Sequence, residues 1–195
     1  MINKCLFPAA GYGTRFLPAT KATPKEMLPI LTKPLIQYGV EEASDAGMDI
    51  MAIITGRGKR ALVEHFDISY ELEHQIKGSS KEELLRTTRD IMDKSTFTFT
   101  RQKEMLGLGH AILKGEPLIG NEPFGVILAD DLCVNEEGDN VLAQLVKIYE
   151  KYKCCVVAIQ EVPKEETYKY GVIEGKEIED CLLYTSDAAD EVSPV

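Results

Sequence analysis

The sequence predicts an α/β fold, in which a mixed, mostly parallel sheet carries helices on both faces. Two observations favour this fold. Short apolar runs of strand length alternate along the chain with longer stretches of helical periodicity. A glycine-containing loop follows the first of these runs and two aspartates follow the fourth, as expected where the carboxyl ends of parallel strands meet a ligand. With 195 residues, the chain is long enough for one such domain with a hydrophobic core.

The elements are predicted in chain order from these patterns. The strands are apolar or β-branched runs bounded by polar and turn-forming residues, at 5–8, 50–55, 96–101, 124–129, 154–160 and 171–174. The helices lie between them, at 35–46, 59–65, 68–77, 81–93, 110–118 and 141–151. Gly47 is placed to end the first helix, and the many charges of residues 67–95 indicate a solvated helical insert.

Composition argues against several classes of function. The net charge is −10 and no basic stripe is present, so no nucleic-acid partner is expected. No apolar run approaches the roughly 20 residues that span a bilayer, so no membrane partner is expected either. The chain opens with Met-Ile-Asn-Lys and runs straight into the first strand, leaving no room for a signal peptide. We therefore expect a cytoplasmic protein.

The five cysteines and three histidines show no metal-binding pattern. None of the cysteines forms a Cys-x-x-Cys pair, and the histidines have no ligand spacing with cysteine or acidic residues. The cysteines are predicted to be free thiols buried in the core, as small apolar residues. Cys154 and Cys155 are adjacent in an apolar run, which predicts that they point to opposite faces of a strand.

A glycine-containing loop after the first strand is the strongest functional signal. Gly11 and Gly13 follow the strand, and the cations Arg15 and Lys25 come soon after. Prolines at 18, 24 and 29 keep this stretch out of regular helix. Glycine allows positive φ and exposes backbone N–H groups, for which phosphate oxygens are natural partners. The loop is therefore predicted to bind phosphate.

This loop departs from the two common glycine-rich motifs. The dinucleotide fingerprint requires a third glycine where the chain has Phe16. The phosphate loop of NTPases requires Gly-Lys-Ser or Gly-Lys-Thr, which the sequence lacks. A long loop that carries fixed positive charge is nevertheless more typical of a binding site than of a structural turn.

The amino-acid sequence of the loop is typical of one family. Gly11-x-Gly-Thr-Arg15 followed by Lys25 resembles the signature of the sugar-nucleotide pyrophosphorylases. Four segments resemble the bacterial UTP–glucose-1-phosphate uridylyltransferases: Pro8-Ala-Ala-Gly11, Leu17-Pro-Ala-Thr-Lys21, Pro24-Lys-Glu-Met-Leu-Pro29 and Lys33-Pro-Leu-Ile-Gln-Tyr38. The resemblance runs from about residue 4 to about residue 180, which is only the first part of a typical family member.

The resemblance implies a Rossmann-like, glycosyltransferase-A-like nucleotidyltransferase fold. It also implies that UTP and glucose 1-phosphate are converted to UDP-glucose and pyrophosphate, with Mg²⁺ as cofactor, by a homo-oligomeric parent protein. Two alternatives remain open. One is a dTTP-dependent glucose-1-phosphate thymidylyltransferase, and the other is a nucleotide-binding fragment without turnover.

The resemblance also assigns roles to particular residues. Arg15 and Lys25 are expected to be catalytic, since both neutralise phosphate charge. Asp130 follows a predicted strand and is expected to hold Mg²⁺, while Asp131 either assists or is merely solvated. The Gln102 amide can donate and accept hydrogen bonds at once, which matches the edge of uracil. The other expected contacts are Ala10, Gly11, Gly13, Thr14, Glu26 and Gly107 with the nucleotide, and Gly171 with the sugar.

The end of the sequence departs from the family. Residues 181–191 match the translation of a sequencing-library adapter instead of the expected strand. We therefore expect a nucleotidyltransferase domain at residues 1–180, truncated at its carboxyl end, and a non-native tail at residues 181–195. The chain as given is expected to lack turnover, because the resemblance places much of the sugar site past this point.

Overall fold

The computed structural model describes residues 2–173, 175–178 and 181–184. The chain forms two compact units, Met1–Val156 and Val157–Val195. The predicted domain boundary lies between residues 180 and 181, directly after residues 179–180, which are outside the described residues, as are residues 185–195 of the predicted tail.

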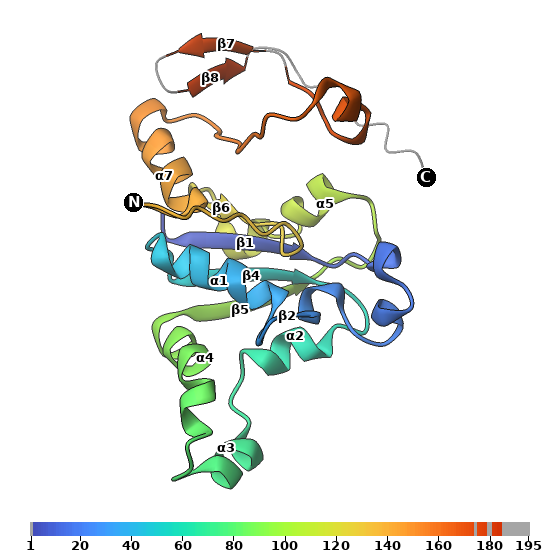
Figure 1. Ribbon diagram of the computed structural model, residues 1–195, viewed down its shortest axis with the longest axis vertical. Helices are drawn as coiled ribbons and strands as arrows, with labels where there is room; N and C mark the ends of the chain where they lie inside the picture. The colour runs from blue at the N-terminus through green and yellow to red at the C-terminus, as the bar shows by residue number, and fades with distance from the viewer. Residues whose placement is uncertain (1, 174, 179–180, 185–195) are drawn as a thin grey trace. The chain divides into compact units, whose positions relative to one another are not determined.

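A four-stranded parallel sheet organises the first unit (Figure 1). Its strands are β1 (Lys4–Ala9), β4 (Ile50–Thr55), β5 (Thr96–Arg101) and β6 (Gly125–Val126), in the spatial order β5-β4-β1-β6. The predictions at 5–8, 50–55 and 96–101 are confirmed, and 124–129 is a strand only over Gly125–Val126. Because all four strands run in parallel, the loops that follow them leave from the same edge of the sheet.

Helices cover both faces of this sheet, as predicted. Neighbouring residues of β1 point to opposite faces: Phe7 joins one core cluster and Leu6 the other. The larger cluster receives residues from α1 (Leu35–Asp45), α2 (Arg60–His65), α4 (Glu82–Lys94) and α7 (Val141–Tyr152). The smaller cluster receives Ala111 and Ile119, which lie on α5 (Leu108–Leu113) and α6 (Glu116–Ile119).

Capping residues define the ends of the long helices. Gly47 follows α1 with φ +87°, so the predicted glycine stop is confirmed. Asn140 caps α7 by accepting a hydrogen bond from the Ala143 N–H at 2.8 Å. The Asn140 amide also donates to the Glu42 carbonyl of α1 at 2.9 Å, which ties α7 to α1. None of the described helices combines the length and apolar character needed to cross a bilayer.

The loop between β1 and α1 avoids regular α-helix, as its prolines predicted. It forms three short 3₁₀ turns, η1 (Thr14–Phe16), η2 (Ala19–Lys21) and η3 (Lys25–Met27). A small antiparallel pair that the sequence pattern missed follows them, made of β2 (Pro29–Ile30) and β3 (Lys33–Pro34). These turns fold the loop back on itself, so residues that are distant along it come into contact.

Two predicted helices differ in detail. The predicted helix 68–77 is shorter in the structure, as α3 (Tyr70–Ile76). The predicted helix 110–118 is divided into α5 and α6 around Gly115, which packs directly on Leu6: a Cβ at Gly115 would lie 2.1 Å from Leu6 Cδ1. The helix is interrupted because Pro117, at the start of α6, has no N–H to donate to the Leu113 carbonyl, while Gly115 allows the close packing against β1.

The predicted strand at 154–160 is wrong. These residues form no strand, because a β-strand requires a hydrogen-bonded neighbour and none pairs with them among the described residues. The prediction of buried thiols is accordingly wrong for Cys154 and Cys155, and also for Cys133, since all three are exposed. It is correct for Cys5, whose thiol pKa is raised by burial. The side chain of Cys181 lies outside the described part.

The second unit is small. It contains the 3₁₀ helix η4 (Lys164–Lys169) and an antiparallel hairpin of β7 (Gly175–Ile178) and β8 (Cys181–Tyr184). The strand predicted at 171–174 is not formed over residues 171–173, and residue 174 is not described. Pairing begins at Gly175 instead, where β8 supplies the neighbouring strand.

Candidate functional site

The glycine loop leaves β1 at the carboxyl edge of the sheet. Gly13 has φ +67°, and a Cβ there would lie 3.0 Å from Lys25 Cβ and 3.2 Å from Thr20 Cγ2. The Thr20 hydroxyl donates to the Gly13 carbonyl at 2.7 Å. Gly13 is therefore required by the backbone and by close packing. Gly11 instead faces open space, since a Cβ there would meet no atom within 4 Å beyond its chain neighbours, and this leaves room for a ligand.

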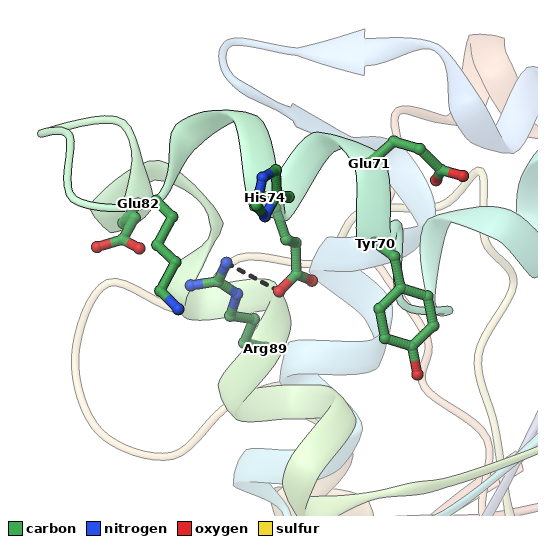
Figure 2. A pocket seen from close by; sticks show the side chains of 7 residues that line it. Tyr70, Glu71, His74, Glu82 and Arg89 are labelled. Atoms are coloured by element: carbon green, nitrogen blue, oxygen red, sulfur yellow. Dashed lines mark hydrogen bonds and ion pairs between the residues drawn. The ribbon is translucent and has the colours of Figure 1, made fainter.

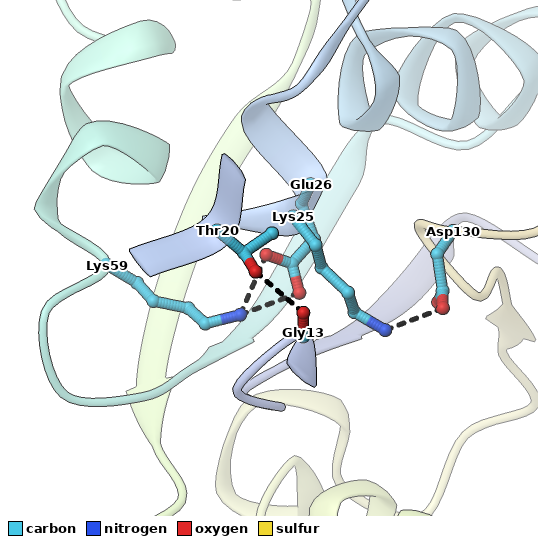
Figure 3. Close-up of polar contacts among 6 residues, drawn as sticks. All are labelled: Gly13, Thr20, Lys25, Glu26, Lys59 and Asp130. Carbon is cyan, nitrogen blue, oxygen red and sulfur yellow. Dashed lines mark hydrogen bonds and ion pairs between the residues drawn. The ribbon is translucent and has the colours of Figure 1, made fainter. Parts of the chain in front are cut away.

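Lys25 and Asp130 meet across this edge. The Lys25 Nζ lies 2.6 Å from Asp130 Oδ2, although the residues are 105 positions apart (Figure 3). Lys25 begins η3, and Asp130 follows the buried Ala129 just past β6. The Asp130 side chain is 36% exposed and that of Lys25 is 18% exposed, so both groups can reach a ligand in solvent. The structure thus brings together the predicted phosphate-binding cation and the predicted metal-binding carboxylate.

A second ion pair lies beside the first and is buried. The Lys59 Nζ lies 2.7 Å from both carboxylate oxygens of Glu26, and the two side chains are 6% and 0% exposed (Figure 3). Burial lowers the pKa of Lys59, and the charge of Glu26 opposes this effect. The expected contact of Glu26 with the nucleotide remains a prediction, because in this structure both of its oxygens face Lys59.

Sequence reasoning missed Lys59. A signal was present, since Lys59 follows β4 just as the glycine loop follows β1, and parallel strands place both loops at one edge. Glu26 lies beside Lys25 in η3, so the buried pair links η3 to the start of α2. This link holds the turn from which Lys25 reaches Asp130.

Gln102 occupies the same edge, after β5. It is 4% exposed, and its main-chain N–H donates to the Thr55 carbonyl at 3.0 Å. Its side-chain Nε2 donates to the Gly107 carbonyl at 3.2 Å and lies 2.9 Å from His110 Nδ1. Gly107 precedes α5 with φ +90° and ψ −177°, a conformation that L side chains rarely adopt. The predicted base-contacting residues are therefore adjacent, and His110 joins them.

The structure locates the other predicted residues by their element and their exposure. Arg15 and Thr14 lie in η1 and are exposed, whereas Ala10 is buried where the chain leaves β1. Asp131 is exposed, and its main-chain N–H donates to the Leu128 carbonyl at 3.0 Å. Gly171 belongs to the second unit, so its predicted sugar contact remains a prediction.

The potential metal ligands at this edge of the sheet suit a hard cation such as Mg²⁺ only in part. No group of three potential ligands from histidine, cysteine, aspartate and glutamate occurs in the described part of the chain. Asp130 supplies an accessible carboxylate, and Mg²⁺ is commonly held by one or two carboxylates together with substrate phosphates. The residues present therefore fit Mg²⁺ that arrives with a nucleotide.

A separate open pocket lies between α3 and α4 (Figure 2). Its volume is about 690 Å³, and across it Arg89 pairs with Glu73 at 3.0 Å. Its lining is mostly charged and shares no residue with the site at the sheet edge; it comprises Tyr70, Glu71, Glu73, His74, Lys77, Glu82 and Arg89. The predicted chemistry therefore does not extend to this pocket.

Comparisons with known proteins agree on one family. The nucleotidyl transferase family matches residues 6–181. A UTP–glucose-1-phosphate uridylyltransferase from Pseudomonas aeruginosa is 64% identical over 194 residues, which cover all of this chain and 70% of the relative. A structure of UDP-glucose pyrophosphorylase complexed with UDP-glucose is 59% identical with a TM-score of 0.84, covering 92% of this chain and 65% of that one. UTP-bound UGPase from Acinetobacter baumannii is 33% identical with a TM-score of 0.87, covering 92% and 64%.

Proposed function

Because the chain belongs to the nucleotidyl transferase family, and within it to the UTP–glucose-1-phosphate uridylyltransferases, we propose that it transfers the uridylyl group of UTP to glucose 1-phosphate. The observation that carries this proposal is the contact between Lys25 and Asp130 at the carboxyl edge of the sheet. It pairs a phosphate-binding cation with a metal-binding carboxylate beside an open glycine loop.

The reaction is a displacement at the α-phosphorus of UTP. A phosphate oxygen of glucose 1-phosphate forms a bond to this phosphorus. The bond from the α-phosphorus to the oxygen bridging the β-phosphate breaks, and pyrophosphate leaves with the electron pair. Negative charge shifts onto the leaving oxygen, so the protein contributes mainly by holding the reactants in line and by neutralising charge.

Lys25 and Arg15 supply this positive charge. Lys25 carries a compact ammonium group on the turn η3, which the Glu26–Lys59 pair ties to the start of α2. In the reaction it would leave Asp130 for the phosphate oxygens. Arg15 is exposed in η1, where its planar guanidinium can bind two oxygens of the triphosphate at once.

Asp130 is the residue proposed to hold Mg²⁺, with Asp131 as its neighbour on the exposed turn. The ion, when bound, would neutralise phosphate charge and fix the orientation of the triphosphate. Without the ion, the ammonium group of Lys25 compensates the negative charge of Asp130.

The uridine is proposed to lie against the glycine loop and the segment after β5. Ala10, Gly11 and Gly13 offer a backbone surface there, and Gln102 and Gly107 offer polar groups to the base. The proposed sugar contact is Gly171. A homo-oligomeric assembly also belongs to this proposal.

A second candidate function is nucleotide binding without turnover, since the chain covers 70% of the P. aeruginosa relative. One experiment separates the two. UTP binding is measured by calorimetry with Mg²⁺, and pyrophosphate release is followed with glucose 1-phosphate and either UTP or dTTP. Release that is much faster with UTP supports the proposal, and binding without release supports the second candidate. Equal rates with dTTP would reject the uridylyl assignment, and no UTP binding would reject both candidates.

A further inference from the structure

The side-chain amide of Gln102 is held in one orientation. Its Nε2 is within hydrogen-bond distance of two acceptors, the Gly107 carbonyl at 3.2 Å and His110 Nδ1 at 2.9 Å. A primary amide nitrogen has two hydrogens, so these two contacts use its full donor capacity. The amide oxygen is the group that remains for a ligand.

The surroundings of the amide oxygen leave it accessible. No described residue donates a hydrogen bond to Gln102 Oε1, and this atom is not among the buried side-chain atoms that lack a partner. It therefore reaches the protein surface even though Gln102 is 4% exposed. Beside it, Gly107 is exposed, with no atom beyond its chain neighbours within 4 Å of the place where a Cβ would stand. A flat base has room to approach at this point.

We propose that His110 is a positioning residue for base selection, because it fixes the Gln102 amide with its oxygen directed at the base. This inference rests on the proposed uridylyl transfer and deepens it. Uracil carries a hydrogen on N3 and can donate it to Gln102 Oε1. Cytosine has a lone pair on N3, which would face the same oxygen and lose the hydrogen bond.

To form a hydrogen bond with N3 of cytosine, the side-chain amide of Gln102 would have to rotate by a half-turn. The oxygen of Gln102 would then face the Gly107 carbonyl, which also accepts the Ala111 N–H at 3.2 Å, and would face His110. The carbonyl cannot become a donor, so it opposes the rotation in every case. His110 opposes it only while its Nδ1 is an acceptor, which makes this imidazole the adjustable part of the arrangement.

The experiment compares His110→Ala with His110→Asn in the full chain. Binding of UTP and of CTP with Mg²⁺ is measured by calorimetry, and thermal unfolding checks that each variant is folded. Asparagine can place its Oδ1 near the position of Nδ1, so it keeps an acceptor for Gln102, whereas alanine removes it. Lys114→Ala, an exposed residue directly after α5, is the matched control.

The expected result concerns the ratio of the two affinities. His110→Ala lowers the preference for UTP over CTP about tenfold, the scale of one unsatisfied buried hydrogen bond. It does so mainly by improving CTP binding. His110→Asn restores most of the preference, and Lys114→Ala leaves it unchanged.

Several outcomes would overturn the inference. An unchanged ratio in His110→Ala, an equal loss of affinity for both nucleotides, or no recovery in His110→Asn would each assign His110 a merely structural role. If the unmodified chain discriminates between UTP and CTP, these failures leave the proposed function intact. Absence of UTP binding by the unmodified chain would instead reject the proposed function and this inference together.

Discussion

The Lys25 ammonium lies 2.6 Å from the Asp130 carboxylate, and each group neutralises the other in the free protein. The two residues come from loops that follow β1 and β6, which are paired in parallel. Phosphate and Mg²⁺ would separate this pair by offering Lys25 a new anion and Asp130 a new cation. Binding of substrate and Mg²⁺ would then replace the contact between Lys25 and Asp130 by one contact of each residue with an oppositely charged ligand.

Replacement of Lys25 by alanine is expected to lower the rate of uridylyl transfer at least about a hundredfold, the scale seen when one preorganised charge is removed. The measurement is pyrophosphate release at saturating UTP and glucose 1-phosphate. Lys21→Ala is the matched control, since Lys21 is an exposed lysine of the same loop. A near-normal rate in Lys25→Ala would remove this residue from the mechanism.

Replacement of Asp130 by asparagine is expected to raise the Mg²⁺ concentration needed for half-maximal UTP binding by about tenfold or more. The amide keeps the shape of the side chain but loses the charge that a hard cation requires. Calorimetric titration of UTP at a series of Mg²⁺ concentrations measures this shift. Asp93→Asn, at an exposed position on α4, serves as the control. The proposed metal ligand would be wrong if both variants showed the same Mg²⁺ dependence.

The buried pair of Glu26 and Lys59 predicts a non-additive effect on stability. Lys59→Met leaves the fully buried Glu26 carboxylate without a cation and is expected to cost about 3–5 kcal/mol in the free energy of unfolding. The double variant Glu26→Leu with Lys59→Met removes both charges and is expected to recover most of this loss.

Urea denaturation measures all three proteins, with Lys77→Met as a surface control that is expected to change stability by less than about 0.5 kcal/mol. If the double variant were as unstable as the sum of the single changes, the two charges would not be coupled. Recovery of stability without recovery of UTP affinity would show that the pair positions η3 as well as stabilising it.

His65 predicts a loss of stability in mild acid. Burial lowers the pKa of His65, whose Nε2 lies 3.0 Å from the amide oxygen of Gln37. Below about pH 6.5 the unfolded chain binds a proton at this residue while the folded chain resists it. Stability from this group is thus present above about pH 6.5 and declines as the pH falls, by at most about 1.4 kcal/mol at pH 5.5.

Urea unfolding at pH 7.5 and pH 5.5 measures the decline, which should be smaller in His65→Gln than in the unmodified chain. His74→Gln replaces an exposed histidine and is expected to leave the decline unchanged. An identical pH dependence in His65→Gln would show that other groups account for the acid sensitivity.

Local patterns in the sequence were enough to predict most elements of the first unit. The apolar runs at β1, β4 and β5 and the helical periodicity of α1 and α7 are confirmed within a residue or two. These patterns depend on contacts between near neighbours along the chain, and each element follows the period of its own backbone. The strand predicted at 154–160 failed because its formation depends on a partner that no local pattern reveals.

The candidate site, like the fold, could be predicted from the sequence only in part. Residue types and spacing pointed to the loop that carries Gly13 and Lys25, and the family resemblance added the expected roles of Gln102 and Asp130. Nothing in the spacing indicated that Lys59 would occupy both oxygens of Glu26, or that His110 would accept a hydrogen bond from Gln102. Which groups meet, and which are left free for a ligand, depends on loops that the parallel sheet gathers at one edge. Only the folded chain brings those loops within hydrogen-bond distance, since Lys25 and Asp130 are 105 residues apart.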